Sequence, residues 1–335
     1  MAGGSKTAVY TAIAANSIVM VAKFVGFGLT GSGSMFSEGV HSLADVGNQT
    51  LLAVGLKRAE LPADEQHPFG YRREAPIWAL ISAVGIFFLG CGFTVYHSVH
   101  AFLHPEPMVS PNTAFAVLAF AFVVEGGALA IAVRALRKEA AKDGITLAAY
   151  IREGDDPMGT AVLAEDSAAV FGVLLAMAGI GMAQLTGDPR WDAAGSLLIG
   201  LLLGGIAIYL IKMNRSLLIG KAPPKQVHDR LKQVLADDPV VESLSTFKTV
   251  VFGSDAVRLS AEVEFHGEAI AARHLAAAYD LEQTWASLEK AEDLEDLLLK
   301  FGDGVVEALG DEVDRLEQAL READPDARLV DLEVN

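Results

Sequence analysis

The sequence has little cysteine and relatively few cationic side chains. Its single cysteine, Cys91, excludes an intrachain disulfide and a zinc cluster built from thiolates. Lys and Arg number 26 against 43 Asp and Glu, which gives a formal net charge of −17. We expect no nucleic-acid partner, because phosphate binding needs clustered cations. The opening MAGGSKT also lacks the layout of a secretory signal peptide.

Apolar residues are abundant and unevenly placed. Hydrophobic residues make up 52% of the chain and charged residues only 21%, and the mean hydropathy of +0.35 is high for a soluble protein. The first two-thirds carries long Ala, Gly, Leu and Val runs, whereas the last third is rich in Asp and Glu. We therefore expect a membrane domain over residues 1–213 and a soluble acidic domain over residues 214–335.

The apolar part contains six stretches that are long enough to span a bilayer. A hydrocarbon core about 30 Å thick needs roughly 20 helical residues. The stretches lie near 8–30, 35–57, 75–102, 112–136, 159–186 and 192–213. Several of them contain polar residues, which predicts a bundle of packed helices. Lys and Arg gather after the second, fourth and sixth stretches, so the positive-inside rule places both termini in the cytoplasm.

The acidic tail predicts a small α+β domain with an antiparallel core. The expected elements are a helix at about 225–236, strands at 245–252 and 257–265, a helical region at about 268–322, and a last strand at 328–334. We expect the helical region to break near Gly302 and Gly304. Residues 268–300 form a helical insertion that is long for such a domain and could pack on the domain or on a partner.

Four polar side chains share one face of the second predicted helix. They follow one another at steps of three and four residues, and they are Glu38, His41, Asp45 and Asn48. Ionisable groups inside a membrane helix are costly and indicate function by default. The imidazole of His41 and the carboxylate of Asp45, one turn apart, suit a borderline ion such as Zn²⁺. Glu38 is a weaker candidate, because an acid near a helix start also complements the helix dipole.

Acids also occur in the predicted fifth and fourth helices. Glu165 and Asp166 are adjacent, so their side chains point about 100° apart, and both reach one ion only if it lies between their faces. Alternatively, one of them binds the ion and the other pairs with a buried cation, for which Lys23 is a candidate. Glu125 is open between a metal ligand, a proton relay and a partner of Lys23.

Longer motifs surround these residues. Two of them are Ser37-Glu-Gly-Val-His-Ser-Leu-Ala-Asp45 and His67-Pro-Phe-Gly-Tyr71. Three more are Glu165-Asp-Ser-Ala-Ala-Val170, Gly310-Asp-Glu-Val-Asp-Arg-Leu-Glu317 and Val330-Asp-Leu-Glu-Val334. With these motifs the chain resembles the cation diffusion facilitator family, which transports zinc and other divalent metals. It is most similar to the mitochondrial zinc exporter branch and its bacterial relatives, over nearly its whole length.

The resemblance implies a six-helix transmembrane bundle with a cytoplasmic α+β domain of ferredoxin-like type. It also implies a homodimer in the lipid bilayer and alternating access with proton antiport. In the family, helices two and five each supply a His/Asp-x-x-x-Asp pair to the transport site. Here Asp166 matches the second member on helix five, but Val162 stands at the first and cannot bind metal, so Glu165 is the obvious substitute. The expected metal ligands are His41, Asp45, Asp166 and Glu165, with Glu38, Asn48 and Glu125 as further candidates.

Together these features predict a divalent-metal efflux transporter, a zinc/proton antiporter first, and not an enzyme. Zn²⁺ and protons are then transported substrates, and no cofactor is expected. The oxygen-rich site leaves Mn²⁺, Fe²⁺, Co²⁺ or Ni²⁺ as alternative ions. A membrane-anchored scaffold with an inert bundle is the alternative from another class, although buried acids on several helices speak against it. The Ala- and Gly-rich chain without a presequence leads us to expect a bacterial plasma (inner) membrane.

Overall fold

The computed structural model describes residues 2–142, 144–153, 157–253 and 256–335. The chain divides into two compact units, one ending at Ile219 and the other covering Gly220–Asn335. The division falls later than the boundary expected after residue 213, because the last helix of the first unit continues to Ile219.

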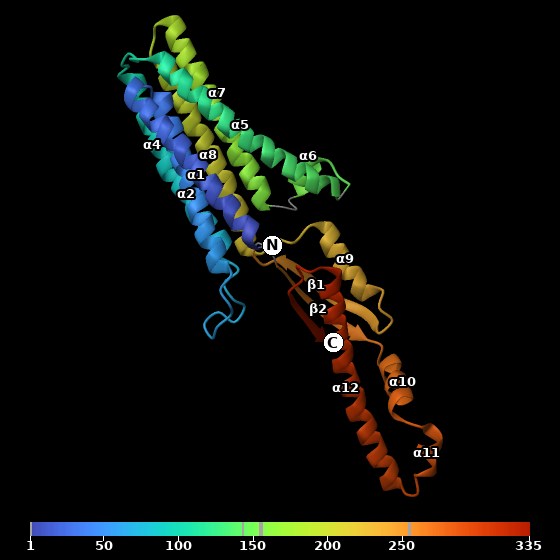
Figure 1. The fold of residues 1–335 in the computed structure, drawn as a ribbon. Helices are drawn as coiled ribbons and strands as arrows, with labels where there is room; N and C mark the ends of the chain where they lie inside the picture. Colours follow the sequence, from blue (N-terminus) through green and yellow to red (C-terminus); the bar gives the residue numbers. More distant parts are fainter. Residues whose placement is uncertain (1, 143, 154–156, 254–255) are drawn as a thin grey trace. The chain divides into compact units, whose positions relative to one another are not determined.

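Long helices packed side by side form the first unit (Figure 1). The elements are α1 (Ala2–Thr30), α2 (Gly33–Ala59), α3 (Glu74–Gly85), η1 (Ile86–Gly92), α4 (Phe93–Leu103), α5 (Pro111–Lys142), α6 (Leu147–Glu153), α7 (Pro157–Thr186) and α8 (Arg190–Ile219). The segment η1 is π-helical and joins α3 to α4 without a loop, so the three correspond to one predicted stretch. The short helix α6 was not expected from the sequence.

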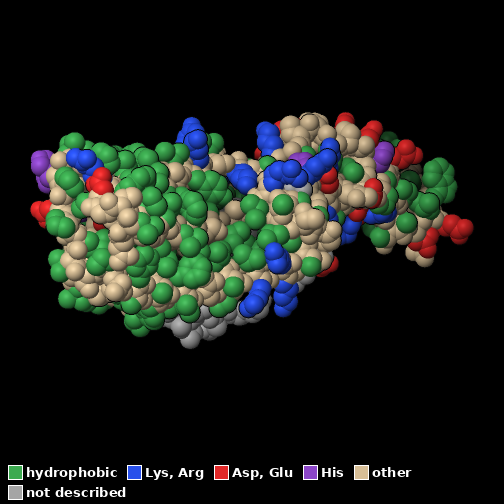
Figure 2. Space-filling model, turned by 90° about the horizontal axis from the view of Figure 1, so that it is seen from above, with side chains coloured by type: hydrophobic (Ala, Val, Ile, Leu, Met, Phe, Trp, Pro, Cys, Tyr) green, Lys and Arg blue, Asp and Glu red, His purple; other side chains and the backbone are tan. Residues whose placement is uncertain are grey.

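Five helical stretches among the described residues are long and apolar enough to cross a membrane. They are Ile13–Thr30, Glu74–Leu103, Pro111–Ala141, Gly159–Thr186 and Arg190–Ile219. Helix α2 is not among them, although its 27 residues would extend about 40 Å at 1.5 Å per residue. Its polar side chains lower its hydropathy. Hydrophobic side chains cover much of the visible surface of the helical unit in Figure 2.

Small residues let α7 and α8 approach each other closely. Gly179 of α7 lies against Gly195 of α8, where a Cβ on Gly195 would come within 3.3 Å of the Gly179 Cα. The same Cβ would stand 3.0 Å from the Ser34 hydroxyl and 3.2 Å from the Leu175 carbonyl. Close backbone approach at glycine is typical of helix packing in membranes, where it replaces the hydrophobic effect as the source of stability.

The start of α2 is fixed by a carboxylate from α8. Asp192 accepts hydrogen bonds from the backbone N–H groups of Gly33 (2.7 Å) and Ser34 (3.2 Å) and from the Ser32 hydroxyl (2.9 Å). A negative group at a helix N-terminus binds unpaired N–H groups and complements the helix dipole. The preceding turn needs Gly31, whose φ of 67° lies in the left-handed region. These contacts set the position from which the polar face of α2 begins.

The second unit is a small α+β domain. Its elements are α9 (Lys225–Ala236), β1 (Val241–Val251), β2 (Val257–Phe265), α10 (Gly267–Ala278), α11 (Leu281–Ala286), α12 (Ala291–Ala323) and β3 (Leu329–Val334). The sheet order is β1-β2-β3, with β1 antiparallel and β3 parallel to β2. The prediction of an antiparallel core is therefore wrong for one of the two pairs. The helices between β2 and β3 carry the chain back across the sheet, which is the connection that parallel strands require.

The core of this domain lies between the sheet and the helices α9 and α12. Leu231 and Leu235 of α9, Leu259 of β2, and Leu316 and Leu320 of α12 are completely buried. These leucines recur on one face of each helix, which is the pattern that predicts burial against a sheet.

The predicted break near Gly302 and Gly304 is wrong, because α12 continues through both residues. A Cβ on Gly304 would collide with the imidazole of His274 in α10. The glycine is thus retained in the helix interior for close packing of α10 on α12, although an interior glycine costs about 1 kcal/mol relative to alanine.

Candidate metal centre

A buried ammonium group joins three helices of the first unit. Nζ of Lys23 in α1 lies 2.6 Å from Oε2 of Glu38 in α2 and 2.6 Å from Oε1 of Glu125 in α5. Lys23 and Glu38 are completely buried and Glu125 is nearly so. At this depth an unpaired charge costs several kcal/mol, so the three groups stabilise one another only as a set. We refer to Lys23, Glu38 and Glu125 as the ion triad.

The ion triad settles one alternative that the sequence left open. Of the three roles that the sequence left open for Glu125, the structure shows the one in which it pairs with Lys23. The other suggestion, that Lys23 pairs with Glu165 or Asp166, is wrong, because its ammonium bonds to Glu38 and Glu125. The contact with Glu38 was not anticipated.

One turn further along α2, the side chain of His41 faces Asp45. Nε2 of His41 lies 3.6 Å from Oδ2 of Asp45, which is longer than a hydrogen bond. His41 is 2% exposed, and its Nδ1 has no hydrogen-bond partner among the residues that the structure describes. An imidazole and a carboxylate with free lone pairs, held side by side in the interior, are donors that suit a borderline divalent cation.

Gly172 of α7 permits this arrangement. A Cβ at that position would collide with Oε1 of Glu38 and would stand 3.5 Å from Nδ1 of His41. The backbone of α7 is therefore in direct contact with the polar face of α2. Gly172 is a residue of this candidate site that the sequence did not reveal, since no local pattern separates it from the other glycines of the membrane helices.

A second polar contact joins α2 to α7 near the other end of the polar face. Nδ2 of Asn48 donates to both carboxylate oxygens of Glu165, at 2.7 and 2.8 Å. The side chain of Asp166, the next residue of α7, is partly buried. Val162, where the resemblance places the first ligand of this helix, has an aliphatic side chain without a donor atom and is 43% exposed. It therefore offers nothing to a metal ion.

The four expected ligands do not converge in this structure. Within the described ranges, no group of three or more His, Cys, Asp or Glu side chains is placed to hold a metal ion. His41 is paired with Asp45, whereas Glu165 is held by Asn48. Glu165 and Asp166 nevertheless lie within electrostatic range of the Asp45 carboxylate. The acids of α2 and α7 thus share one interior region without forming a closed coordination shell.

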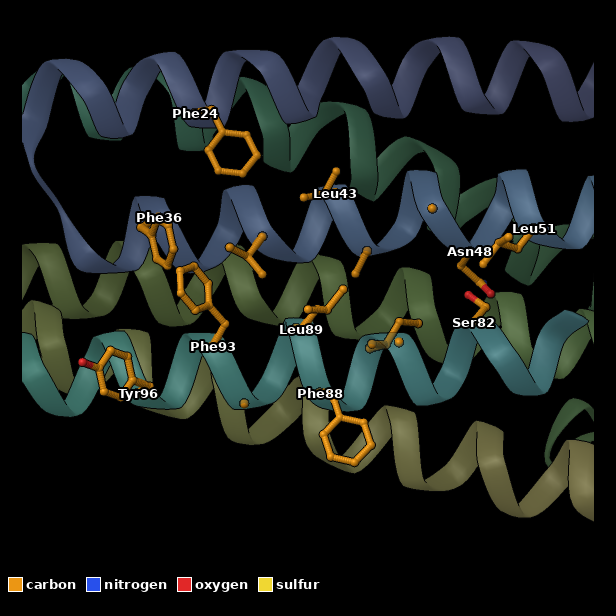
Figure 3. A pocket seen from close by; sticks show the side chains of 17 residues that line it. Phe24, Phe36, Leu43, Asn48, Leu51, Ser82, Phe88, Leu89, Phe93 and Tyr96 are labelled. Atoms are coloured by element: carbon orange, nitrogen blue, oxygen red, sulfur yellow. The ribbon is translucent and has the colours of Figure 1, made fainter.

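A cavity of about 800 Å³ opens beside α2, between it and the helical rod of α3, η1 and α4 (Figure 3). Its walls are mainly apolar, with Phe36, Phe88 and Phe93 among the residues that line it. Asn48 and Ser82 supply polar atoms toward one end. Neither His41 nor Asp45 lines this cavity. An apolar wall offers no ligands to a hydrated cation, so we do not place the metal site there.

These features define a class of protein. Ionisable side chains from four helices meet inside a membrane-type bundle, and intramembrane charges of this kind mark ion and substrate pathways. The model of the cation efflux transmembrane domain matches residues 9–219. The chain belongs to this family, whose members are transporters and not enzymes. The resemblance to cation diffusion facilitators is thereby confirmed.

Several curated proteins are similar to this chain. The mitochondrial proton-coupled zinc antiporter SLC30A9 of Mus musculus is 39% identical over 335 residues, which cover 99% of this chain and 59% of the relative. Metal tolerance protein C4 of Arabidopsis thaliana is 38% identical over 338 residues, covering 99% of this chain and 74% of the relative. The manganese efflux system protein MneP of Bacillus subtilis is 27% identical over 238 residues, covering 69% and 74%. The chain thus spans about 59% of the length of the mitochondrial relative.

The expected bacterial plasma membrane is contradicted by these relatives. The proteins that are 38–39% identical over almost the whole chain come from an animal and a plant, and the animal protein is named mitochondrial. These relatives do not support a bacterial plasma membrane, and the cytoplasmic placement of both termini, which was part of that expectation, is not carried further. The expectation rested on the Ala and Gly content and on the lack of a presequence in the given sequence. Composition sets helix packing and hydropathy but carries no targeting signal. An integral membrane protein remains the conclusion.

Proposed function

We propose that this chain is a zinc/proton antiporter that works by alternating access. The observation that carries the proposal is the buried His41 and the partly buried Asp45, 3.6 Å apart, on a helix that packs against α7, which carries two further acids. The zinc-transporting relative, which is 39% identical, supports the choice of ion. A site of one imidazole and several carboxylates provides the nitrogen and oxygen donors that Zn²⁺ accepts in tetrahedral geometry.

The proposed ligands are His41, Asp45, Glu165 and Asp166. In this structure Glu165 is held by Asn48, so metal binding requires its carboxylate to leave that amide and turn toward Asp45. We therefore assign Asn48 the role of holding Glu165 when the site is empty of cargo. Glu38 and Glu125 are engaged by Lys23, and we leave both out of the ligand set.

Proton exchange follows from the chemistry of His41. A neutral imidazole binds a metal ion, whereas a protonated imidazole cannot, so protonation and metal binding compete for the same nitrogen. The Asp45 carboxylate, its neighbour at 3.6 Å, can hold a proton by the same competition. Protons arriving from one side of the membrane thus release the metal ion that entered from the other side.

The arrangement of the protein in the bilayer completes the proposal. We propose that α2 also spans the membrane, which brings the number of spanning segments to six. It packs among α1, α3, α7 and α8 and is long enough to cross the bilayer. The second unit, with its strand order β1-β2-β3, is proposed to be a ferredoxin-like domain in which residues 268–300 are an insertion. We further propose a homodimer, which is the typical assembly of this family.

Manganese is the second candidate ion. Three of the four proposed ligands are carboxylates, which favour harder ions, and the Bacillus subtilis relative is named a manganese efflux protein. Competition flux in proteoliposomes across Zn²⁺, Mn²⁺, Fe²⁺, Co²⁺ and Ni²⁺ separates the candidates. Zinc is expected to be carried fastest.

The Asp45→Ala variant tests the site. Removing this carboxylate deletes one of four ligands, so zinc flux in proteoliposomes should fall by about 100-fold or more. The Asp64→Ala variant, which removes an acid from the loop after α2, is the matched control and should transport at the wild-type rate. Both variants should elute from size-exclusion chromatography like the wild type. Wild-type zinc flux in Asp45→Ala would exclude the proposed site.

A further inference from the structure

The three residues of the ion triad are not among the proposed metal ligands, although they lie beside them. We propose that Lys23 determines metal selectivity, acting as a tethered cation that keeps Glu38 and Glu125 away from the transported ion. This inference rests on the proposed function, because it concerns the carboxylates that surround the same site.

The ammonium group of Lys23 binds both Glu38 and Glu125 through short, buried contacts. Each Nζ–oxygen distance is 2.6 Å, in the range of charge-assisted hydrogen bonds, and the ammonium is completely buried. Water does not compete for these contacts at this depth. Breaking either contact leaves a carboxylate unpaired in an apolar interior, which costs several kcal/mol. The triad is therefore a persistent feature of this conformation rather than a fluctuating surface pair.

The triad lies next to the proposed metal ligands. Glu38 precedes His41 by one helical turn, and both side chains lie in the space that a Cβ on Gly172 of α7 would enter. Oε1 of Glu38 and Oε2 of Glu125 have no hydrogen-bond partner among the described residues. Each acid thus has one oxygen bound to Lys23 and one oxygen free. Without Lys23, both carboxylates would be free to turn toward an ion beside His41.

The number of available donors decides which ion the site prefers. Five carboxylates face the interior from α2, α5 and α7, and they belong to Glu38, Asp45, Glu125, Glu165 and Asp166. With Lys23 holding two of them, His41 and three carboxylates remain, which matches four-coordinate Zn²⁺. With all five released, the donor set approaches the six oxygen-rich positions that Mn²⁺ prefers. Lys23 thus limits both the number of ligands and the negative charge that the ion meets.

A purely structural role for Lys23 makes a different prediction. If the triad only holds α1, α2 and α5 together, its removal should slow all metals equally and leave their flux ratio unchanged. The Mn²⁺-to-Zn²⁺ flux ratio is therefore the decisive readout, because helix packing alone does not move it.

The experiment compares four chains in proteoliposomes loaded with Zn²⁺ or Mn²⁺. The Lys23→Gln variant should raise the Mn²⁺-to-Zn²⁺ flux ratio by about 10- to 100-fold, the range in which supporting residues alter metal affinity. The Lys23→Gln/Glu38→Gln/Glu125→Gln triple variant releases no carboxylate and should keep the wild-type ratio. Lys57→Gln, which removes an exposed lysine at the end of α2, is the charge-matched control and should also keep it. Mn²⁺ binding to the detergent-solubilised chains, followed by electron paramagnetic resonance, should increase only in Lys23→Gln.

The outcomes separate the inference from the proposed function. Zinc flux in the wild type together with an unchanged ratio in Lys23→Gln overturns the selectivity role and leaves the antiporter proposal standing. A wild-type chain that carries neither metal overturns both. If Lys23→Gln fails to fold, Lys23→Gln/Glu38→Gln replaces it, because it frees Glu125 alone and carries less repulsion. That double variant should still raise the ratio above the triple variant, and equal ratios in the two would overturn the inference.

Discussion

The two units of the chain place the same kinds of charged group in different surroundings. In the membrane unit, Lys23 contacts two glutamates and is completely buried. In the C-terminal unit, Arg315 donates to both carboxylate oxygens of Asp238 at 2.9 Å and to Glu312 at 2.6 Å, while its own side chain is 45% exposed. Both clusters satisfy the geometry of a good ion pair, so distance alone does not distinguish them.

Burial makes the difference between these two clusters. An exposed ion pair is screened by water and typically contributes between about 0 and 1 kcal/mol. Removing one partner of a buried cluster leaves charge without solvation and costs about 3–5 kcal/mol. Loss of the exposed cluster should therefore change the free energy of unfolding little, whereas loss of one member of the ion triad should change it strongly. For this reason we assign a function to the ion triad, whereas the Arg315 cluster only stabilises the local packing of α12.

The largest effect is expected when the cation is removed from the triad. In Lys23→Met, Glu38 and Glu125 remain buried without a counter-charge, so the free energy of unfolding should fall by about 3–5 kcal/mol. Thermal unfolding of the detergent-solubilised protein measures the loss. Adding Glu38→Gln and Glu125→Gln to Lys23→Met should restore most of the stability, since an uncharged set has no unpaired charge. Equal stability of Lys23→Met and wild type would show that the triad is not energetically coupled.

An intermediate effect is expected at Gly172, where α7 meets the charged face of α2. The Gly172→Ala variant should displace the Glu38 side chain and lower stability by about 1–3 kcal/mol, as overpacking does, and zinc flux should decrease with it. Gly181→Ala on the same helix is the control, because its Cβ meets only Phe115 at an ordinary 3.7 Å. The control should be neutral or up to about 1 kcal/mol more stable, from the helix propensity of alanine. Similar results for the two variants would argue against close contact at Gly172.

The smallest effect concerns the exposed cluster and its dependence on pH. Burial opposes ionisation of Asp238, but the hydrogen bonds from Arg315 outweigh it and lower the pKa of this carboxyl below its ordinary value. A lowered folded-state pKa contributes stability above the unfolded-state pKa of about 3.9, and this stability is lost as the pH falls through the folded-state value. Because Arg315 is largely solvated, Arg315→Met should lower local stability at neutral pH by only about 0.5–1 kcal/mol.

Hydrogen exchange of the α12 and β1 amides, corrected for the intrinsic rate, measures this effect in the full chain. Wild type and Arg315→Met should differ at neutral pH and converge in acid, below about pH 4. Arg321→Met, which removes a pair with Glu317 inside α12, is the control and should have a smaller effect with no contribution from Asp238. A difference that persists unchanged into acid would show that Arg315 acts through its packing and not through its charge.

Much of the fold follows from the sequence because it depends on local patterns. The expected helix at 225–236 coincides with α9, and the strand at 257–265 coincides with β2. Hydropathy alone identified the long apolar helices, because spanning a bilayer demands a fixed number of apolar residues. The parallel pairing of β3 with β2 and the unbroken α12 depend on contacts between distant segments, which periodicity does not report.

The candidate site divides in the same way. The proximity of His41 and Asp45 was predictable, because residues four apart on a helix are neighbours. The contact between Lys23 and Glu38 was not predictable, because the two residues lie on different helices. The position of Glu38 near the start of α2 was already explained by interaction with the helix dipole. The hydrogen bond from Asn48 to Glu165 was also missed, because the two residues lie on different helices, α2 and α7. A sequence shows which side chains share a face, but it does not show which helix that face meets.

The polarity of α2 has a consequence for how the protein is made. An acid at the centre of a helix adds about 2.5–3.5 kcal/mol to the free energy of insertion by the translocon, and α2 carries its charged face through the middle of its length. The tight turn at Gly31 joins it directly to the apolar α1. The proposal that α2 spans the bilayer therefore implies insertion of α1 and α2 as a hairpin, in which Lys23 of the first helix offsets the charge of Glu38 in the second. Glu125 of α5, which follows later in the chain, would complete this ion cluster afterwards.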